Sequence, residues 1–383
     1  MTIVTSRTLT AFIALTLASG FTVTGTAAQA APPEPITIAV EAPLTGSQSA
    51  NGIDMYRGVK LAVDQVNAKG GVLGRKVRLV KADDQANPDL ALSVAAGVKA
   101  AGAVAVVGPY NSSVGVVNLP FYVQNRIIPV QMTSTDQTTG MGVTIQPKNS
   151  QISPVEVSYM QDGYGYTGCP SVVMLVDPSD YTVGMADRVD TGMMCGDGAH
   201  KKRIVVTPGL SDYTAQVSQA LALKPDILYV STYYPEGAAI AKAILVAKTT
   251  AHCFMGLANV DPAFVTASGI PAARNCTFSG VPAAAQLPTA TAYVTAYRKA
   301  FGEQPGVWGT FTYDSAMMLF AAMAKAGSTD YAPVLKNLRN TKGYSGQTGT
   351  ITMNAKTGNR VKPPVFILEV DKKGVFVIKP GVS

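Results

Sequence analysis

The sequence VAVVGPYNSS at residues 104–113 decides the fold of this chain, together with IIPVQMTST at residues 127–135. Each stretch is a short apolar run that is broken by Gly or Pro and continues into hydroxyl-bearing residues. Such runs, separated by helix-compatible sequence, predict parallel strands of an open α/β sheet. Ligands of these sheets bind beyond the carboxyl ends of the strands, where helix N-termini leave backbone N–H groups unpaired. The two corners therefore predict a crevice that suits a small carboxylate.

The same alternation of strand and helix runs through the rest of the chain in two series. The first series has strands at 36–40, 77–81, 104–107 and 127–130, with a helix at 52–67. The second series has strands at 172–176, 204–207, 227–231, 253–257 and 277–281. Strand–helix–strand repetition at this spacing is typical of parallel sheets with right-handed crossovers, and two series imply two similar lobes. A long helix at about 310–326 and an antiparallel tail, 349–353 and 365–370, complete the predicted elements.

The first thirty residues have the pattern of a cleavable export signal. Arg7 is their only charged residue, an apolar stretch follows at 9–20, and Ala28-Gln29-Ala30 offers a small-x-small cleavage pattern. An uncleaved N-terminal anchor is the alternative. We expect the mature protein to be soluble and to act outside the cytoplasm.

Composition sets the protein class. The chain has 383 residues, of which 47% are hydrophobic and 14% charged, as in globular proteins. About 350 residues remain after the leader, which fits two lobes better than one core. The formal net charge of +7 is scattered, and Lys201-Lys202-Arg203 is the only run of three. Because nucleic-acid binding needs a basic stripe with interleaved aromatic residues, we expect a solvated surface here.

The four cysteines, Cys169, Cys195, Cys253 and Cys276, suggest disulfides, since an even count in an exported chain is typical of them. Three pairings are possible. Cys169 precedes one predicted strand and Cys195 ends the helix after it, whereas Cys253 and Cys276 open neighbouring strands. We therefore favour Cys169–Cys195 and Cys253–Cys276, with free buried thiols as the alternative.

Motifs for catalysis or for a cofactor give no support for an enzyme: GYGYTG at 163–168 has the GxGxxG pattern of dinucleotide sites but precedes a predicted strand instead of following one. There is no CxxC spacing, and the two histidines lie far from any cysteine cluster, so we expect no metal site. The sequence contains no phosphate-binding loop, no nucleophile elbow and no evident acid–base pair. These absences favour a binding protein without a cofactor over an enzyme.

Seven further stretches look like parts of one known family. They are IAV and PLTG within 38–46, GVKLAVDQVNAKGG at 58–71, KADD and NP within 81–88, YYPEG at 233–237, FMG at 254–256, YD at 313–314, and GQTGT at 346–350. Together they resemble the type I periplasmic binding proteins of the branched-chain amino-acid (Leu/Ile/Val) transport family. The resemblance spans the mature chain, and the helix that ends in NAKGG is its most specific part.

The resemblance implies an α/β fold of two Rossmann-like lobes joined by three hinge crossovers, near Gln151, Val281 and Arg360. After a signal peptide at 1–30, lobe 1 would comprise 34–151 and 281–360, and lobe 2 would comprise 152–280 and 361–383. It also implies a periplasmic substrate-binding protein that delivers its ligand to an ABC permease in the inner membrane. We expect this protein to be a monomer. A sensory module that binds ligand without transport is the rival reading.

Residues that would hold the ligand carboxylate follow from the same resemblance. A serine of the family matches Ser112, a threonine matches Thr135, and a backbone group matches Thr133, in agreement with the two corners. For a single hydroxyl at a helix start, N-capping is the alternative reading.

Three aromatic residues match positions that surround the rest of the ligand. Tyr181 and Tyr233 would come from the second lobe, and Trp308 would lie against the ligand side chain. Ordinary core or hinge packing is the alternative for each of them. Aromatic residues in a cleft fit a mostly apolar pocket.

One departure concerns the ligand ammonium. Amino-acid binders of this family carry an acid after the FMG strand, where this chain has Ala258. Asp261 or Glu41 could replace that acid, although Asp261 is also placed to cap the helix that follows. The ligand is therefore either an amino acid or amino-acid-like carboxylate, or an aromatic acid, a keto acid or an amide such as urea.

Overall fold

The computed structural model describes residues 1–6, 8, 11, 33–193 and 201–381. The chain divides into a short part, Met1–Pro33, and one compact unit, Glu34–Ser383, which is the subject of everything below. Most of the predicted signal peptide, 1–30, lies outside the described residues and stays a prediction. No helix in the described ranges has the length and apolar content needed to cross a membrane.

The first sheet has four parallel strands in the order β2-β1-β3-β4. Its strands are β1 (Ile36–Ala42), β2 (Val77–Asp83), β3 (Ala105–Val107) and β4 (Ile128–Val130). Its first helices are α1 (Ser49–Ala68), α2 (Ala91–Ala100) and α3 (Ser112–Gln124). Alternate residues of β1 face opposite layers: Ile38 and Val40 pack with the α1 side, whereas Ala39 packs with α2 and α3. Burial on both faces explains why these strands have apolar runs instead of alternation.

The second sheet has seven strands in the order β13-β12-β9-β8-β7-β5-β6. Its strands are β5 (Val172–Val176), β6 (Lys201–Val205), β7 (Ile227–Ser231), β8 (His252–Met255), β9 (Cys276–Gly280), β12 (Phe366–Val370) and β13 (Phe376–Ile378). Strands β5 to β9 are parallel, and β12 and β13 are antiparallel additions at one edge. Its helices are α5 (Asp180–Gly192), α6 (Thr214–Leu221), α7 (Tyr234–Ala247), α8 (Pro262–Ser268) and α9 (Ile270–Arg274).

The prediction for β6 was wrong by three residues at the start of the strand and by two at its end. We expected 204–207, but the strand is Lys201–Val205 and includes the basic run. Strand β6 lies at the edge of the sheet, where charged side chains reach solvent and discourage further pairing. Arg203 there binds Asp187 at 2.6 Å and Asp190 at 3.1 Å.

The chain passes between the two sheets more than once. Helix α4 (Asn149–Ser158) and the π-helical turn η3 (Tyr159–Gly163) lead into β5. After β9 come α10 (Thr291–Phe301), α11 (Val307–Ala326), α12 (Tyr331–Arg339), β10 (Tyr344–Gly346) and β11 (Gly349–Ile351), and then the chain enters β12. Short helices are η1 (Pro88–Leu90), η2 (Asp136–Thr138), η4 (Leu257–Asn259), η5 (Ala284–Gln286) and η6 (Pro288–Ala290). Helix α11 packs along α1, so this return belongs with the first sheet.

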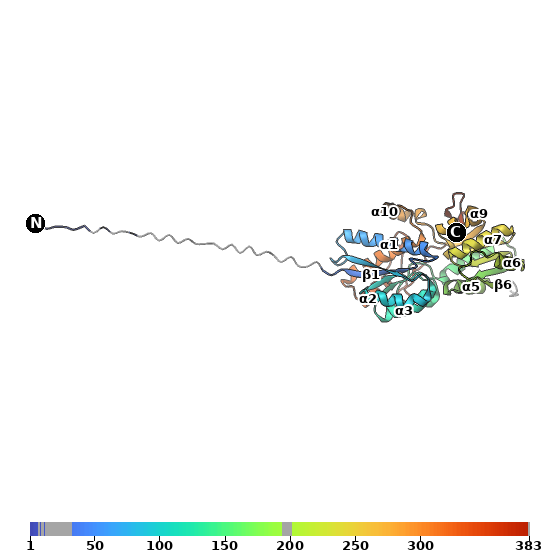
Figure 1. The fold of residues 1–383 in the computed structure, drawn as a ribbon, viewed down its shortest axis with the longest axis horizontal. Helices are drawn as coiled ribbons and strands as arrows, with labels where there is room; N and C mark the ends of the chain where they lie inside the picture. Colours follow the sequence, from blue (N-terminus) through green and yellow to red (C-terminus); the bar gives the residue numbers. More distant parts are fainter. Residues whose placement is uncertain (7, 9–10, 12–32, 194–200, 382–383) are drawn as a thin grey trace. The chain divides into compact units, whose positions relative to one another are not determined.

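We call the elements on the four-stranded sheet, β1–β4, α1–α3 and α10–α12, the first lobe, and those on the seven-stranded sheet the second lobe (Figure 1). The predicted tail strands are split between the β10–β11 hairpin and the second sheet. The residue limits of the lobes given in the sequence analysis stay a prediction.

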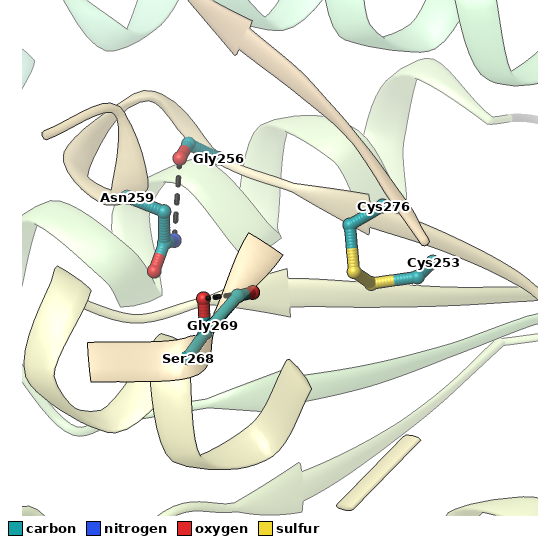
Figure 2. The surroundings of a disulfide bond; sticks show 6 residues. All are labelled: Cys253, Gly256, Asn259, Ser268, Gly269 and Cys276. Atoms are coloured by element: carbon teal, nitrogen blue, oxygen red, sulfur yellow. Dashed lines mark hydrogen bonds between the residues drawn. A yellow bond between two sulfur atoms is a disulfide. The ribbon is translucent and has the colours of Figure 1, made fainter. Parts of the chain in front are cut away.

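One predicted disulfide is confirmed. Cys253 and Cys276 are directly opposite each other in the register of β8 and β9 and are joined by an S–S bond (Figure 2). The bond therefore links the N-terminal ends of two neighbouring parallel strands. The other predicted pair, Cys169–Cys195, includes Cys195, which lies outside the described residues.

Candidate functional site

A small cavity lies between the lobes at the carboxyl ends of both sheets. Its wall in the first lobe consists of Tyr110, Ser112, Met132, Ser134, Gln146 and Trp308. Its wall in the second lobe consists of Tyr181, Tyr233, Leu257 and Ala258. Most of these residues come within five residues after the end of a strand: Ser112 follows β3, Tyr233 follows β7, and Ala258 follows β8. The crevice is therefore where the parallel topology places a ligand.

The two hydroxyl-rich corners meet as the sequence predicts. Ser112 is the first residue of α3, and its Oγ accepts a hydrogen bond from the backbone N–H of Thr135 at 3.2 Å. The N-cap is Asn111, so Ser112 does not have the capping role considered as its alternative. Thr133 and Thr135 are buried beside the wall, and the Thr133 hydroxyl lies 2.6 Å from that of Thr138. Ligand binding by these three residues stays a prediction.

Four aromatic rings form a continuous surface across both walls. The ring centroids of Tyr110 and Trp308 are 5.5 Å apart, those of Tyr110 and Tyr233 6.1 Å, and those of Tyr181 and Tyr233 5.7 Å. The rings are tilted or edge-on to one another, the arrangement that their quadrupoles favour. Burial raises the pKa of Tyr110, of Tyr181 and of Tyr233, so all three phenols are neutral hydroxyls at physiological pH.

The space between the rings is small. About 10 Å³ is open to the centre of a water molecule, close to the roughly 10–15 Å³ that one water needs. A ligand of several heavy atoms therefore enters only if the lobes separate or the rings turn. Contacts between the lobes hold the present arrangement: the N–H of Asp180 donates to Ser113 Oγ at 2.9 Å, and Tyr234 Oη donates to the carbonyl of Ser47 at 2.8 Å.

A second, larger cavity adjoins the first at the outer part of the cleft. It has about 420 Å³ open to the centre of a water molecule, and residues of both lobes line it. Tyr233 belongs to the walls of both cavities. Asp177 and Glu236 give the outer cavity an acidic lining, and burial raises the pKa of each carboxyl.

The ten residues of the inner cavity include no ionisable acid or base other than tyrosine hydroxyls. Ala258 lines the cavity where the family resemblance implies an acid. Asp261 caps α8, since its Oδ1 accepts from the N–H of Ala263 at 2.7 Å, so the capping alternative is confirmed. Burial raises the pKa of Asp261 to about 6.

The suggestion that Glu41 meets a ligand ammonium is wrong. Its carboxylate accepts from Asn118 Nδ2 at 2.5 Å and from Tyr122 Oη at 2.7 Å, both on α3. Two residues after Ala39 on β1, Glu41 points to the same face of the strand, beneath α3 and away from the crevice. Complete burial, together with the nearby Asp84, raises the pKa of the Glu41 carboxyl.

Several residues at the site were not singled out from the sequence. Tyr110, Met132 and Ser134 lie inside the two quoted corners, so their proximity to the site was predictable. Gln146 and the buried Lys148 come from the loop before α4, a segment whose sequence has no strand or helix period to mark it. Only the tertiary structure brings that loop against the second corner.

Comparison with known proteins agrees with this architecture. Residues 35–375 match the periplasmic binding protein family. The Leu/Ile/Val-binding protein BraC3 of Rhizobium johnstonii is 30% identical over 78% of this chain and 81% of its own length. Leu/Ile/Val-binding protein homolog 2 of Brucella abortus is 27% identical over 86% of this chain and 89% of its own length.

Solved structures share the fold at lower identity. A leucine binding protein from Thermotoga maritima superimposes with a TM-score of 0.81 at 23% identity, covering 91% of this chain and 99% of its own. A solute binding protein of an ABC transporter from Rhodopseudomonas palustris, in complex with 3,4-dihydroxybenzoic acid, has a TM-score of 0.78 at 19% identity and covers 91% and 98%. With two parallel-rich sheets, an interlobe crevice and a family match over most of its length, this chain belongs to the periplasmic binding protein family, whose members are non-enzymatic solute-binding proteins.

Proposed function

We propose that this protein is the extracytoplasmic binding component of an ABC importer, and that its ligand is a small carboxylate without a charged amine. Aromatic acids and 2-oxo acids are the chemical classes that fit. The observation that carries this proposal is the uncharged lining of the inner cavity, with Ala258 at the position of the family's acid. A ligand ammonium removed from water needs an anionic partner, and none of the lining residues supplies one.

The ligand carboxylate would bind at the two corners. Ser112 Oγ, the hydroxyl of Thr135 and the backbone at Thr133 offer donors beside the N-terminus of α3, whose partial positive charge favours an anion. The apolar part of the ligand would then contact Tyr110, Trp308 and the aromatic residues of the second lobe. Because both lobes contribute contacts, the ligand stabilises the closed form more than the open one.

The named relatives support a binding protein but include different ligands. The two curated relatives described above are named for leucine, isoleucine and valine, whereas proteins of the same fold are solved with isoleucine, with 3,4-dihydroxybenzoic acid and with benzoate. An amino-acid ligand is the alternative for this chain, and it would need Asp261 to leave its helix cap. The capping bond of Asp261 at 2.7 Å therefore favours the amine-free ligand.

A matched pair of ligands tests the ligand class. Leucine and 4-methyl-2-oxopentanoate share a carbon skeleton and differ at C2, where one has an ammonium and the other a carbonyl oxygen. We expect the oxo acid or benzoate to raise the midpoint of thermal unfolding and leucine and urea to leave it unchanged. A ligand at 100 times its Kd adds about 2.7 kcal/mol of stability. Stabilisation by leucine alone would contradict the proposed ligand class.

Transport is tested in cells. We expect uptake of the stabilising acid to be lost when the gene for this protein is deleted and to be restored by the intact gene. Unchanged uptake, combined with a lost transcriptional or motility response to the same acid, would instead support the sensory alternative.

A further inference from the structure

A buried lysine lies directly behind the second corner. Lys148 is fully buried at the N-cap of α4, and its side chain runs beneath residues 131–138. Its Nζ has three N–H donors and lies within hydrogen-bonding distance of four oxygens: the carbonyls of Thr133 at 3.0 Å and Thr135 at 3.1 Å, Thr138 Oγ1 at 2.7 Å and Gln131 Oε1 at 3.3 Å. All four acceptors are neutral oxygens, so the ammonium is solvated by the loop but not neutralised by it.

The charge of Lys148 has no direct anionic partner among the described residues. None of their ion pairs includes it. The acid that acts on it electrostatically, Asp136, binds Arg188 at 2.7 Å and Ser150 Oγ at 2.6 Å. Buried charges are ordinarily paired, because an isolated ammonium is costly to remove from water. An unpaired buried lysine therefore points to a negative charge supplied from outside the chain.

Peptide geometry shows on which side that charge would lie. A trans peptide is planar, with its C=O and the following N–H on opposite sides. Because the carbonyl of Thr133 points toward Lys148, the N–H of Ser134 points away from it. Ser134 lines the inner cavity. The loop thus has the ammonium on one side and the proposed carboxylate site on the other, and only the backbone of the loop separates them.

We propose that Lys148 is a specificity-determining residue, whose ammonium acts through residues 133–138 to favour anionic ligands over neutral and zwitterionic ones. This inference rests on the proposed function. Lys148 orients the loop by binding two of its carbonyls, and its positive charge stabilises the ligand carboxylate. The same charge repels a ligand ammonium, and no acid in the lining of the inner cavity offsets this repulsion.

The protonation of Lys148 supplies a second readout. Burial lowers its pKa to about 7, and Asp136 opposes this shift. Other charged groups on the elements around it include the buried Glu156 on α4 itself, Arg188 and Asp180 on α5, and Arg360 beside α4, where Arg360 meets Gln151 through its backbone carbonyl. A bound carboxylate favours the ammonium and raises its pKa, so binding at slightly alkaline pH takes up a fraction of a proton.

The test compares a charged probe with its uncharged analogue. Lys148→Met keeps most of the side-chain length and removes the charge. By titration calorimetry at pH 6.5 we expect the variant to bind benzoate, or 4-methyl-2-oxopentanoate if that is the tighter acid, at least tenfold more weakly than the wild type. Binding of the corresponding amide, benzamide or 4-methyl-2-oxopentanamide, should change less than threefold. Lys148→Gln, which retains a donor for the loop carbonyls, should weaken the acid as much as Lys148→Met does.

The outcomes separate this inference from the proposed function. Equal weakening of acid and amide, or no weakening of the acid, overturns the role of Lys148 while leaving the proposed function intact. A wild-type protein that binds leucine or urea and none of the acids contradicts the proposed function and the inference together. If the variants fail to fold, wild-type titrations at pH 7.5 in two buffers of different ionisation enthalpy decide: proton uptake supports the inference, and its absence overturns it.

Discussion

The two walls of the inner cavity are built on similar strand ends but are backed by opposite kinds of ionisable group. Behind the wall of the first lobe lies Lys148, whose pKa burial lowers to about 7. Behind the wall of the second lobe lies Glu156, whose pKa burial raises to about 7. Both walls carry aromatic side chains, but the serine hydroxyls and backbone of the two corners belong to the first wall, whereas the second wall consists of tyrosine, leucine and alanine side chains. The difference supports the proposal that a ligand carboxylate would bind to the first lobe, with the aromatic residues of both lobes around its apolar part.

We expect the largest effect when the hydroxyls of the first wall are removed, because this change tests the difference between the walls directly. Ser112→Ala combined with Thr135→Ala removes two hydrogen bonds to a carboxylate, each of which contributes about 1.5–3 kcal/mol. We therefore expect roughly a hundredfold or greater loss of acid affinity by calorimetry. Ser113→Ala, whose hydroxyl accepts from Asp180 at the rim, is the matched control and should retain most of the affinity. Unchanged affinity in the double variant would disprove the carboxylate assignment.

The second lobe can be weakened without touching either wall. Replacing Cys253 and Cys276 with alanine opens a loop with a sequence separation of 23. In the chain-entropy model such a crosslink contributes about 3 kcal/mol. We expect this loss in denaturant unfolding, with the Kd for the acid nearly unchanged. A large loss of affinity would show that the far end of the β8–β9 pair controls the cavity wall.

The acid behind the second wall makes stability depend on pH. Glu156 accepts from Tyr229 Oη at 2.8 Å and Ser279 Oγ at 2.5 Å, and burial is the main cause of its raised pKa. A raised carboxyl pKa means that stability is fully present below the unfolded-state pKa and is lost as pH rises through about 7. Glu156→Gln should therefore be more stable than the wild type by about 3 kcal/mol at pH 8 and should lose most of this advantage at pH 5. An advantage that is equal at both pH values would contradict this origin.

The smallest predicted effect sharpens the charge difference between the walls. Ala258→Asp places a carboxylate in the second wall, where a ligand ammonium would lie. We expect leucine affinity to increase about tenfold relative to 4-methyl-2-oxopentanoate, which corresponds to about 1.4 kcal/mol. Ala258→Asn has nearly the same volume without the charge and serves as the control. Equal affinity ratios in the two variants would show that the missing acid does not decide the ligand class.

The sequence predicts much of the fold because local pattern and tertiary environment agree there. The strands at 172–176 and 227–231 have the predicted bounds, and α1 ends at Ala68, where Lys69-Gly70-Gly71 predicts its stop. Cys253 and Cys276 pair because they begin neighbouring strands. These features follow from short-range periodicity and from the order of parallel strands.

The site is predictable only in part, because side-chain direction and loop packing depend on the tertiary fold. The corners at 108–113 and 131–135 come together, as the parallel topology requires. Glu41 lies at a strand end near the crevice, yet the alternation of β1 directs it toward Asn118 on α3. Lys148 is in a loop without periodicity, and its partners are 10 to 17 residues earlier in the chain. No local pattern distinguishes it from a surface lysine.

Because Tyr233 belongs to the walls of both cavities, its ring separates an inner chamber the size of a water from an outer one of about 420 Å³. While the lobes stay closed, rotation of this ring is one route by which a molecule would move between the chambers. A ligand then has two parallel routes of release, rotation of one buried phenol or separation of the two lobes, and the faster route sets the release rate. Residence time and affinity are thereby controlled separately. A smaller residue in place of Tyr233 would shorten the residence time of the ligand, but it would leave the carboxylate contacts that determine the affinity nearly unchanged.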